Sequence, residues 1–104
     1  MVAGGSEPSW NLFVDKLDGG GYSFKLVTLA TDEGEIRGTL QLMEGSMNSS
    51  EERVVFKGID HNKNSIEITQ SNLECTDMSG QSHERTVRVK WREFDFLGCD
   101  YTKK

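Results

Sequence analysis

The sequence predicts an all-β fold, either a small antiparallel β-barrel or a closed sandwich of about seven to eight strands. Three observations support this prediction. Apolar and polar residues alternate with a period of two through most of the chain, which is typical of half-buried strands. Turn residues, glycine above all, separate most of the alternating blocks. The 104 residues are enough for a single domain, residues 1–104, and too few for a second one.

Seven alternating blocks mark the predicted strands in chain order. Their apolar positions are Trp10, Leu12 and Val14; Tyr22, Phe24 and Leu26; Ile36, Leu40 and Leu42; Val54 and Phe56; Ile66 and Ile68; Val87, Val89 and Trp91; and Phe94 and Phe96. All of these except Val14 and Tyr22 are expected to contribute to the core, because alternate residues of a strand share one face.

Turn chemistry separates the blocks. The predicted connections are Asp18–Gly21, Asp32–Gly34, the longer polar loop Gly45–Glu52, Asp60–Asn64, an ordered loop over Ser71–Ser82, and a glycine-free turn at Arg92–Glu93. Glycine is suited to the first two because it adopts a positive φ without steric cost. The polar loop also contains Asn48-Ser49-Ser50, which fits a glycosylation sequon.

The alternation also favours a closed shape. A single flat sheet would leave its apolar face and its edges exposed, and curling into a lipocalin-like meander removes both problems. The bulky side chains of Trp10, Phe24, Phe56, Trp91 and Phe96 favour a filled interior. A carrier of a small apolar ligand remains an alternative, because small barrels can also hold one ligand.

The formal net charge of −5 argues against general nucleic-acid binding, which needs cations to neutralise phosphates. It suits a basic partner, through long-range electrostatic steering. Solubility alone accounts for the same charge.

The two cysteines, Cys75 and Cys99, can be free thiols, metal ligands or a disulfide. Two thiolates alone cannot fill a zinc site, and neither His61 nor His83 has the spacing of a zinc ligand. A disulfide is the preferred interpretation, because small secreted domains use disulfides to supplement a modest core. It would close a loop of about 25 residues and stabilise the fold by roughly 3 kcal/mol.

The disulfide also bears on the compartment. The start of the chain, Met1-Val2, has neither the basic nor the apolar segment of a signal peptide. The protein is therefore either cytoplasmic or has lost its leader. The disulfide favours a periplasmic or cell-envelope protein whose leader is absent from this chain.

No set of residues predicts catalysis or metal binding. Ser79 lies four residues from His83, but no nucleophile-elbow sequence surrounds it and no orienting acid can be identified. Asp60-x-Asn62-x-Asn64 imitates the start of a calcium loop. The imitation then fails, because serines stand where the loop needs a glycine and a bidentate glutamate. We therefore expect no enzyme, no metal and no cofactor.

A basic stripe runs along one predicted strand. Arg88, Lys90 and Arg92 would share a face, with Arg85 nearby. These cations could bind an anion. A solvated face that discourages edge pairing is the favoured interpretation.

Two segments resemble a known family. The run Gly5-Ser6-Glu7-Pro8-Ser9-Trp10 resembles the Gly-Thr-Glu-Pro-Phe-Trp opening of a family of small bacterial cell-envelope proteins. Cys75-x-Asp77-Met78-Ser79, followed by Leu97-Gly98-Cys99, resembles the closing pattern of the same family. Many members are known only as predicted lipoproteins or membrane proteins of unknown function.

This resemblance implies an exported, non-enzymatic β protein whose cysteines pair. A lipid anchor on a removed N-terminus is compatible with it, and the expected state is a monomer. Glu7 and Pro8 would fix the start of the first strand, and Trp10 would plug one end of the barrel. Asp77 and Ser79 would hydrogen-bond backbone amides of their own loop.

A weaker resemblance points to the barrel-type lysozyme inhibitors of bacterial envelopes, in which a Ser-Gly-containing loop enters the cleft of the enzyme. Ser79-Gly80 and the cation Lys90 would play those parts here. The expected function is a non-catalytic envelope domain that binds an unknown envelope or extracellular partner. The candidate binding residues are Asp77, Met78, Ser79, Gly80 and Lys90. A lysozyme inhibitor, acting on a basic lysozyme through Met78-Ser79-Gly80, is the alternative.

Overall fold

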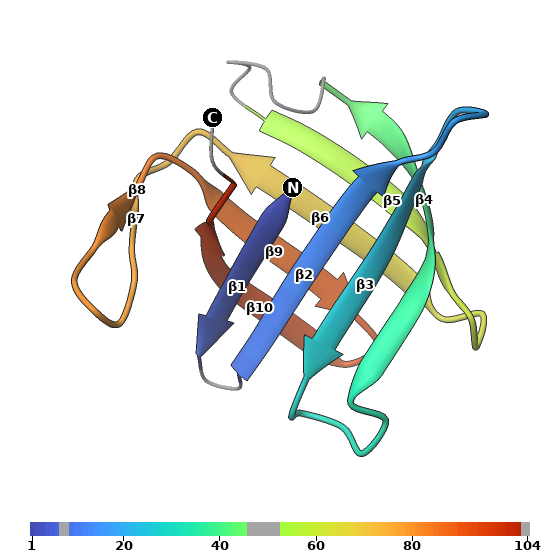
Figure 1. The fold of residues 1–104 in the computed structure, drawn as a ribbon, viewed down its shortest axis with the longest axis horizontal. Coiled ribbons are helices and arrows are strands. Elements are labelled where there is room, and N and C mark those ends of the chain that lie inside the picture. The colour runs from blue at the N-terminus through green and yellow to red at the C-terminus, as the bar shows by residue number, and fades with distance from the viewer. Residues whose placement is uncertain (7–8, 46–52, 103–104) are drawn as a thin grey trace.

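The predicted antiparallel barrel is confirmed by the computed structural model, which describes residues 1–6, 9–45 and 53–102 (Figure 1). The barrel strands are β1 (Val2–Ser6), β2 (Ser9–Lys16), β3 (Tyr22–Thr28), β4 (Glu35–Glu44), β5 (Arg53–Asp60), β6 (Ser65–Ser71), β9 (Thr86–Trp91) and β10 (Phe94–Asp100). A second sheet of two strands contains β7 (Cys75–Thr76) and β8 (Ser82–His83).

The eight barrel strands form a meander in which each strand pairs with the next, and β1 closes the barrel against β10. The small β7–β8 sheet is inserted between β6 and β9, which pair with each other (Figure 1). We call the segment 75–83, which contains β7, β8 and the turn between them, the ribbon. The part of the chain that the structure describes contains no helix long and apolar enough to cross a bilayer.

The core lies inside the barrel and contains the predicted residues. All of the predicted core side chains are buried except Leu42 and Phe94, which are half-buried and pack against the cluster. Met1, Ala3 and Val14 add to it. The bulky side chains that favoured a filled interior, including both tryptophans, are all buried.

The sequence analysis missed β1 and the two short strands of the ribbon. Strand β1 reads Val-Ala-Gly-Gly-Ser, which has too few large apolar residues to show alternation. It is a strand because it pairs with β2 on one side and β10 on the other. Ser71–Ser82 was predicted as an ordered loop, and its central part forms β7, the following turn and the start of β8. The predicted polar loop and its sequon at Asn48 lie outside the described residues, apart from Gly45.

The predicted turn Asp60–Asn64 is organised by a buried carboxylate. The Oδ1 atom of Asp60 accepts hydrogen bonds from the backbone N–H of Asn62 at 2.8 Å and of Asn64 at 2.9 Å. Its Oδ2 atom accepts one from the indole N–H of Trp91 at 2.8 Å. Burial opposes the charged form of Asp60, but the hydrogen bonds from Trp91, Asn64 and Asn62 outweigh it and lower the pKa of this carboxyl.

The glycine-free turn at Arg92–Glu93 is also present. Arg92 adopts a φ of 54°, a left-handed conformation that is uncommon outside glycine. Its guanidinium lies 4.2 Å from the centroid of the Trp91 ring and donates to both carboxylate oxygens of Glu33, at 2.5 and 2.9 Å. These contacts hold the arginine in place at the turn.

We predict that Asp60→Asn lowers the free energy of unfolding by about 2 kcal/mol or more, because an amide cannot accept all of these hydrogen bonds and leaves a buried donor unpaired. Urea denaturation at neutral pH measures this loss. Because the folded-state pKa of Asp60 is lowered, its contribution is present above the unfolded-state pKa, about 4, and is lost as the pH falls through the folded-state value. The stability gap between wild type and variant should therefore shrink in acid. The exposed Asp32 provides a control, and Asp32→Asn should change stability little. Equal stability of wild type and Asp60→Asn at neutral pH would contradict the role of this carboxylate.

Candidate functional site

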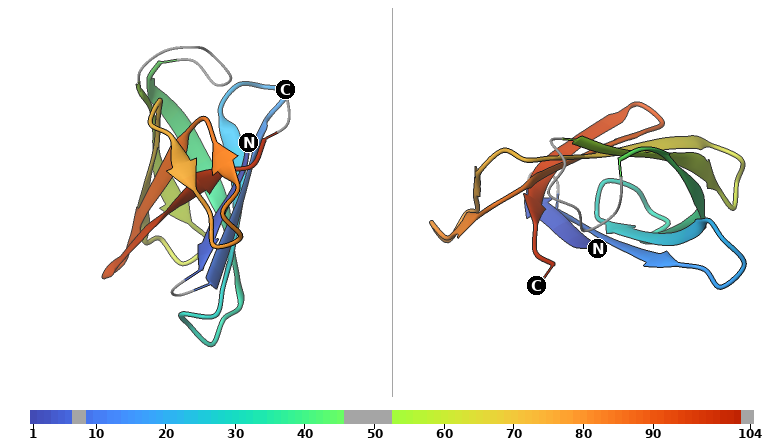
Figure 2. Two further views of the ribbon diagram at one scale, coloured as in Figure 1. Left: turned by 90° about the vertical axis from the view of Figure 1, so that its left-hand side faces the viewer. Right: turned by 90° about the horizontal axis from the view of Figure 1, so that it is seen from above.

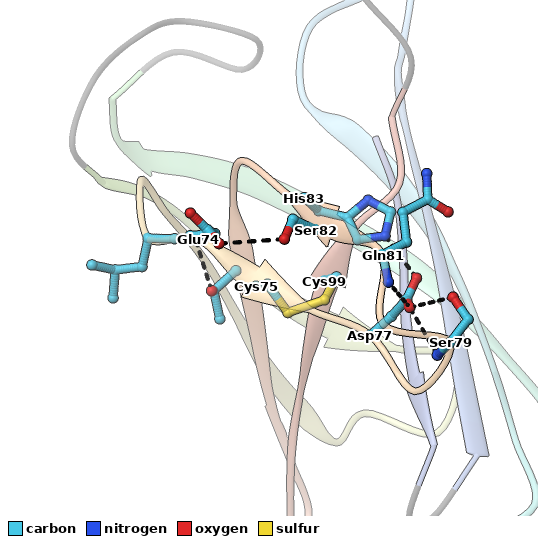
Figure 3. Close-up of a disulfide and its surroundings, with 10 residues drawn as sticks. Glu74, Cys75, Asp77, Ser79, Gln81, Ser82, His83 and Cys99 are labelled. Atoms are coloured by element: carbon cyan, nitrogen blue, oxygen red, sulfur yellow. Dashed lines mark hydrogen bonds and ion pairs between the residues drawn. A yellow bond between two sulfur atoms is a disulfide. The ribbon is translucent and has the colours of Figure 1, made fainter.

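The ribbon is attached to the barrel by a disulfide. Cys75 in β7 and Cys99 in β10 are bonded, with their Cα atoms 5.5 Å apart (Figure 3). This confirms the predicted pair. Figure 2 shows the ribbon projecting from one side of the barrel. The bond therefore fixes β7 of the ribbon directly to β10 of the barrel.

The turn of the ribbon is ordered by one carboxylate. The Oδ1 atom of Asp77 accepts hydrogen bonds from the backbone N–H of Ser79 at 2.9 Å, from the Ser79 hydroxyl at 2.6 Å and from the backbone N–H of Gln81 at 3.0 Å (Figure 3). Its Oδ2 atom lies 2.9 Å from Nε2 of His83. The hydrogen bonds from Ser79, and after them the one from His83, lower the pKa of Asp77. Asp77 thus accepts hydrogen bonds from backbone amides of its own loop, as expected, whereas the hydroxyl of Ser79 donates to Asp77 and not to a backbone group.

A second attachment joins the ribbon to Tyr101, the residue that follows β10. The ring of His83 meets the ring of Tyr101 edge-on, with the centroids 4.6 Å apart. Tyr101 is itself fixed, because its backbone N–H donates to the carbonyl of Val2 at 2.7 Å. Burial, and then the charge of Asp77, raise the pKa of the Tyr101 hydroxyl. The ribbon is therefore held by a covalent bond on β7 and by an aromatic contact on β8.

The hydrogen bonds also define what chemistry the loop supports. Ser79 and His83 both bind to Asp77, and they occupy its two different oxygens. A serine nucleophile needs a base that can take its proton, and the hydroxyl of Ser79 donates to Asp77, whose lowered pKa makes it a weak base. The hydrogen bonds to Asp77 instead order the turn of the ribbon. In the part of the chain that the structure describes, no group of three or more His, Cys, Asp or Glu side chains is placed to hold a metal ion.

A cleft of about 860 Å³ lies between the ribbon and the outer side of β1 and β10. Met78 and Ser79 line it from the ribbon, and Gly4 and Leu97 line it from the barrel. Met78 is 78% exposed and Leu97 is 64% exposed. Two large apolar side chains are therefore left in water on opposite walls of one cleft.

The cleft is acidic. Its lining contains Glu74, Asp77 and Asp95, and no lysine or arginine is among the described residues that line it. Asp95 is paired with Arg88, whose guanidinium donates to both carboxylate oxygens, at 2.8 and 2.5 Å. This pairing lowers the pKa of Asp95. Two of the three carboxylates are therefore already engaged, Asp95 by Arg88 and Asp77 by its own turn.

Lys90 does not line the cleft. It lies opposite Asp95 in the ladder between β9 and β10, and it lines a separate hollow of about 530 Å³ together with Lys57, Glu67 and Arg92. The structure therefore brings Asp77, Met78 and Ser79 together at one cleft, while Lys90 is a neighbour of one residue of its lining. Lys90 was grouped with the loop on the weaker resemblance to lysozyme inhibitors.

The remaining predicted residues divide into three groups. Gly80 has a φ of 88° and closes the ribbon turn, in which its N–H donates to the carbonyl of Asp77 at 3.0 Å. Trp10 is buried at the inner end of the cleft and stacks on Phe96, with the ring centroids 5.8 Å apart. Glu7 and Pro8 lie outside the described residues.

The basic stripe is largely paired. Arg88 binds Asp95 and Arg92 binds Glu33. Arg85 donates to the side-chain oxygen of Gln70 at 3.3 Å. The stripe does not guard an edge, because β9 pairs with both β6 and β10, and Arg92 lies in the turn beyond β9.

Sequence reasoning missed Leu97 and Tyr101 as site residues. A signal for Leu97 was present, because it alternates with Phe96 and must point outward when that side chain points into the core. No signal was present for Tyr101, whose contact with His83 depends on where the ribbon folds back.

No protein-family profile, curated protein or solved structure matches the chain. The resemblances described above therefore rest on the quoted residues alone.

We predict that removing the disulfide lowers the free energy of unfolding by about 3 kcal/mol, because the unfolded chain loses the closure of a loop with a sequence separation of 24. Urea denaturation of a Cys75→Ser, Cys99→Ser double variant measures the loss. The intact protein should resist alkylation without reductant. Rapid alkylation of both thiols in native, air-handled protein would contradict the pairing.

We predict that Asp77→Asn loosens the ribbon turn and leaves the barrel intact. Hydrogen exchange at the backbone amides of Ser79 and Gln81 should become faster, while exchange at Val89 in β9 should not change. Ser79→Ala is the matched variant, and it should have a smaller effect because both backbone hydrogen bonds to Asp77 remain. Unchanged exchange in Asp77→Asn would show that the carboxylate does not order this turn.

Proposed function

We propose that the protein is a non-catalytic binding domain of the bacterial cell envelope, and that it binds its partner in the cleft beside the ribbon. One observation carries the proposal. Met78 and Leu97 are exposed on opposite walls of the cleft, while the wall that carries Met78 is fixed by a disulfide and a hydrogen-bonded turn.

The polar groups of the ribbon are used internally, which leaves its apolar tip available for a partner. Asp77, Ser79 and Gln81 are engaged in the turn, whereas the side chain of Met78 is largely exposed. A loop that is ordered before binding loses less conformational entropy when it meets a partner. Methionine suits this role, since its flexible apolar side chain adapts to varied surfaces.

The disulfide supports an exported location. A disulfide that fixes a surface element persists in an oxidising, exported location. Assignment to the periplasm, and a lipid anchor on a segment absent from this chain, rest on the resemblance to the envelope family.

Inhibition of a lysozyme is the second candidate. Two observations favour it. Ser79 and Gly80 lie in the turn between β7 and β8 of the ribbon, which projects from the barrel (Figure 2), and the cleft beside it is lined by Glu74, Asp77 and Asp95, which suits a basic enzyme. Because Lys90 lines a different hollow, inhibition of a lysozyme would depend on the ribbon alone, without a contribution from that cation.

An affinity experiment with envelope extract tests the binding site. Met78→Lys and Leu97→Lys each place a charged side chain in the cleft. Ile59→Lys is the control, because Ile59 is also exposed, at 51%, and lies on β5 outside the cleft. We predict that a protein retained by wild type and by Ile59→Lys is lost from both cleft variants while the melting temperatures stay close. Equal retention by all four proteins would overturn the assignment of the site.

A lysozyme assay separates the two candidates. Inhibition by wild type that is lost in Ser79→Ala and Met78→Lys would establish the second function. No inhibition at a large molar excess over several lysozymes would remove it and would leave the first proposal standing.

A further inference from the structure

The turn between β2 and β3 contains three consecutive glycines, and the backbone conformation explains only two of them. Gly20 and Gly21 have φ values of 100° and 77°, which residues with a side chain rarely adopt. Gly19 has no such φ, and a Cβ added to it would meet no atom within 4 Å. The fold therefore needs glycine at positions 20 and 21, and it would accept alanine at position 19.

The residue before Gly19 is an aspartate whose carboxylate is free. Asp18 and Gly19 are both exposed. The turn is closed by its other residues, because the N–H of Gly20 donates to the carbonyl of Leu17 at 3.2 Å and the N–H of Leu17 donates to the carbonyl of Gly21 at 3.0 Å. Among the described residues, neither the Asp18 carboxylate nor the Gly19 N–H takes part in a hydrogen bond or an ion pair. Two groups that can react with each other are thus adjacent in the chain and unengaged.

The carboxylates of two other turns are used differently. Asp60 and Asp77 each accept hydrogen bonds from two backbone N–H groups of their own turns, which fixes both the carboxylate and the nearby backbone. Each of them is also followed by a residue with a side chain. Asp18 is the only aspartate or asparagine of the sequence that a glycine follows. It therefore differs from them both in its neighbour and in its freedom.

We propose that Asp18-Gly19 is a site of spontaneous modification, at which Asp18 isomerises to isoaspartate. The backbone nitrogen of Gly19 attacks Cγ of the protonated Asp18 carboxyl group, and the proton of the nitrogen leaves with the carboxyl OH as water. This forms a five-membered succinimide ring. Water then adds to one of the two ring carbonyls. Opening at the former side-chain carbonyl restores aspartate, and opening at the main-chain carbonyl gives isoaspartate.

The reaction needs nothing besides water. One water molecule leaves in the first step and one is added in the second, so the mass of the protein does not change and no oxidant or reductant takes part. Glycine at position 19 promotes the first step because it has no side chain to hinder the approach of its nitrogen to Cγ, and because its backbone rotates freely. Exposed loop tips are also the places where a chain tolerates such rotation.

The barrel should remain folded after the change. Isoaspartate lengthens the main chain by one carbon, and this carbon lies within the turn. The ladder between β2 and β3 ends at the pair of Lys16 with Tyr22, before the turn begins. Asp18 is not among the residues that line the cleft beside the ribbon. The modified protein should therefore accumulate in a folded form that keeps the cleft, and this inference is independent of the proposed binding function.

Peptide mapping of aged protein tests the site. Purified protein is kept warm at neutral pH for weeks, and its proteolytic peptides are separated at intervals. The peptide that contains Asp18 should divide into two species of identical mass, and an isoaspartyl carboxyl methyltransferase should label only the new one. The increase should be confined to Asp18 among the described aspartates. Failure of this peptide to change, or an equal change at Asp32, would overturn the proposal. Asp32 is a suitable control because it is exposed and is followed by Glu33, which has a side chain.

Two variants test the chemistry. Asp18→Glu cannot form the five-membered ring, so the methyltransferase should label nothing at this position. Gly19→Ala should slow the reaction about tenfold or more, while the melting temperature should not change because the position accepts a Cβ. Equal rates in wild type and Gly19→Ala would overturn the assignment of this dipeptide as the reactive unit.

A peptide with the sequence of Lys16–Tyr22 tests whether the folded turn leaves the two groups free. The rate in the folded protein should lie within about tenfold of the rate in the peptide. A much slower reaction in the folded protein would show that the turn protects Asp18, and this would overturn the proposal. Aged protein should also keep the melting temperature of fresh protein and slow hydrogen exchange at Val89 in β9. Unfolding of the modified fraction would overturn its accumulation as a folded form.

Discussion

The crossing of β1 over β10 is the constraint on which the rest of the molecule depends. The two strands meet at Gly4 and Gly98, where a side chain does not fit: an added Cβ on Gly98 would lie 2.0 Å from the carbonyl oxygen of Gly4 and 2.8 Å from the Trp10 ring. Because both positions are glycine, the first and last strands approach closely enough to close the barrel. Closure gives the core its enclosed interior and removes the free edges that an open sheet would present.

The ribbon depends on the same crossing. Its disulfide ends at Cys99, which pairs with Gly4, and its aromatic contact is made to Tyr101, which is bonded to Val2. Both attachments therefore lie within a few residues of the closure. Cys99 and Tyr101 therefore take part both in closing the barrel and in positioning the ribbon. The geometry of the cleft is set by the closure of the barrel.

Much of the fold was predictable because most of its strands show the alternation of apolar and polar residues that half-buried strands have. Val87, Val89 and Trp91 alternate with charged residues, and all three are buried. Strand β1 has no such signal, since Ala3 and Gly4 contribute little apolar surface, and it exists through its pairing with distant residues. The disulfide and the capping role of Asp77 were predictable because they depend on local chemistry and on a choice among a single pair of cysteines. The cleft was not predictable, because it depends on where the ribbon folds back beside β1 and β10, which no local pattern in the sequence specifies.

The closure also explains why the disulfide lies where it does. Elsewhere in the barrel neighbouring strands pair over most of their length, as β2 and β3 do from Trp10 to Lys16. Within the described residues, the ladder between β1 and β10 contains two pairs, Ala3 with Asp100 and Gly4 with Cys99. Cys99 is also bonded to Cys75, so the covalent bond of the ribbon is placed at this short ladder. The same bond fixes the ribbon beside the closure, and Met78 is exposed on the wall of the cleft that the ribbon forms.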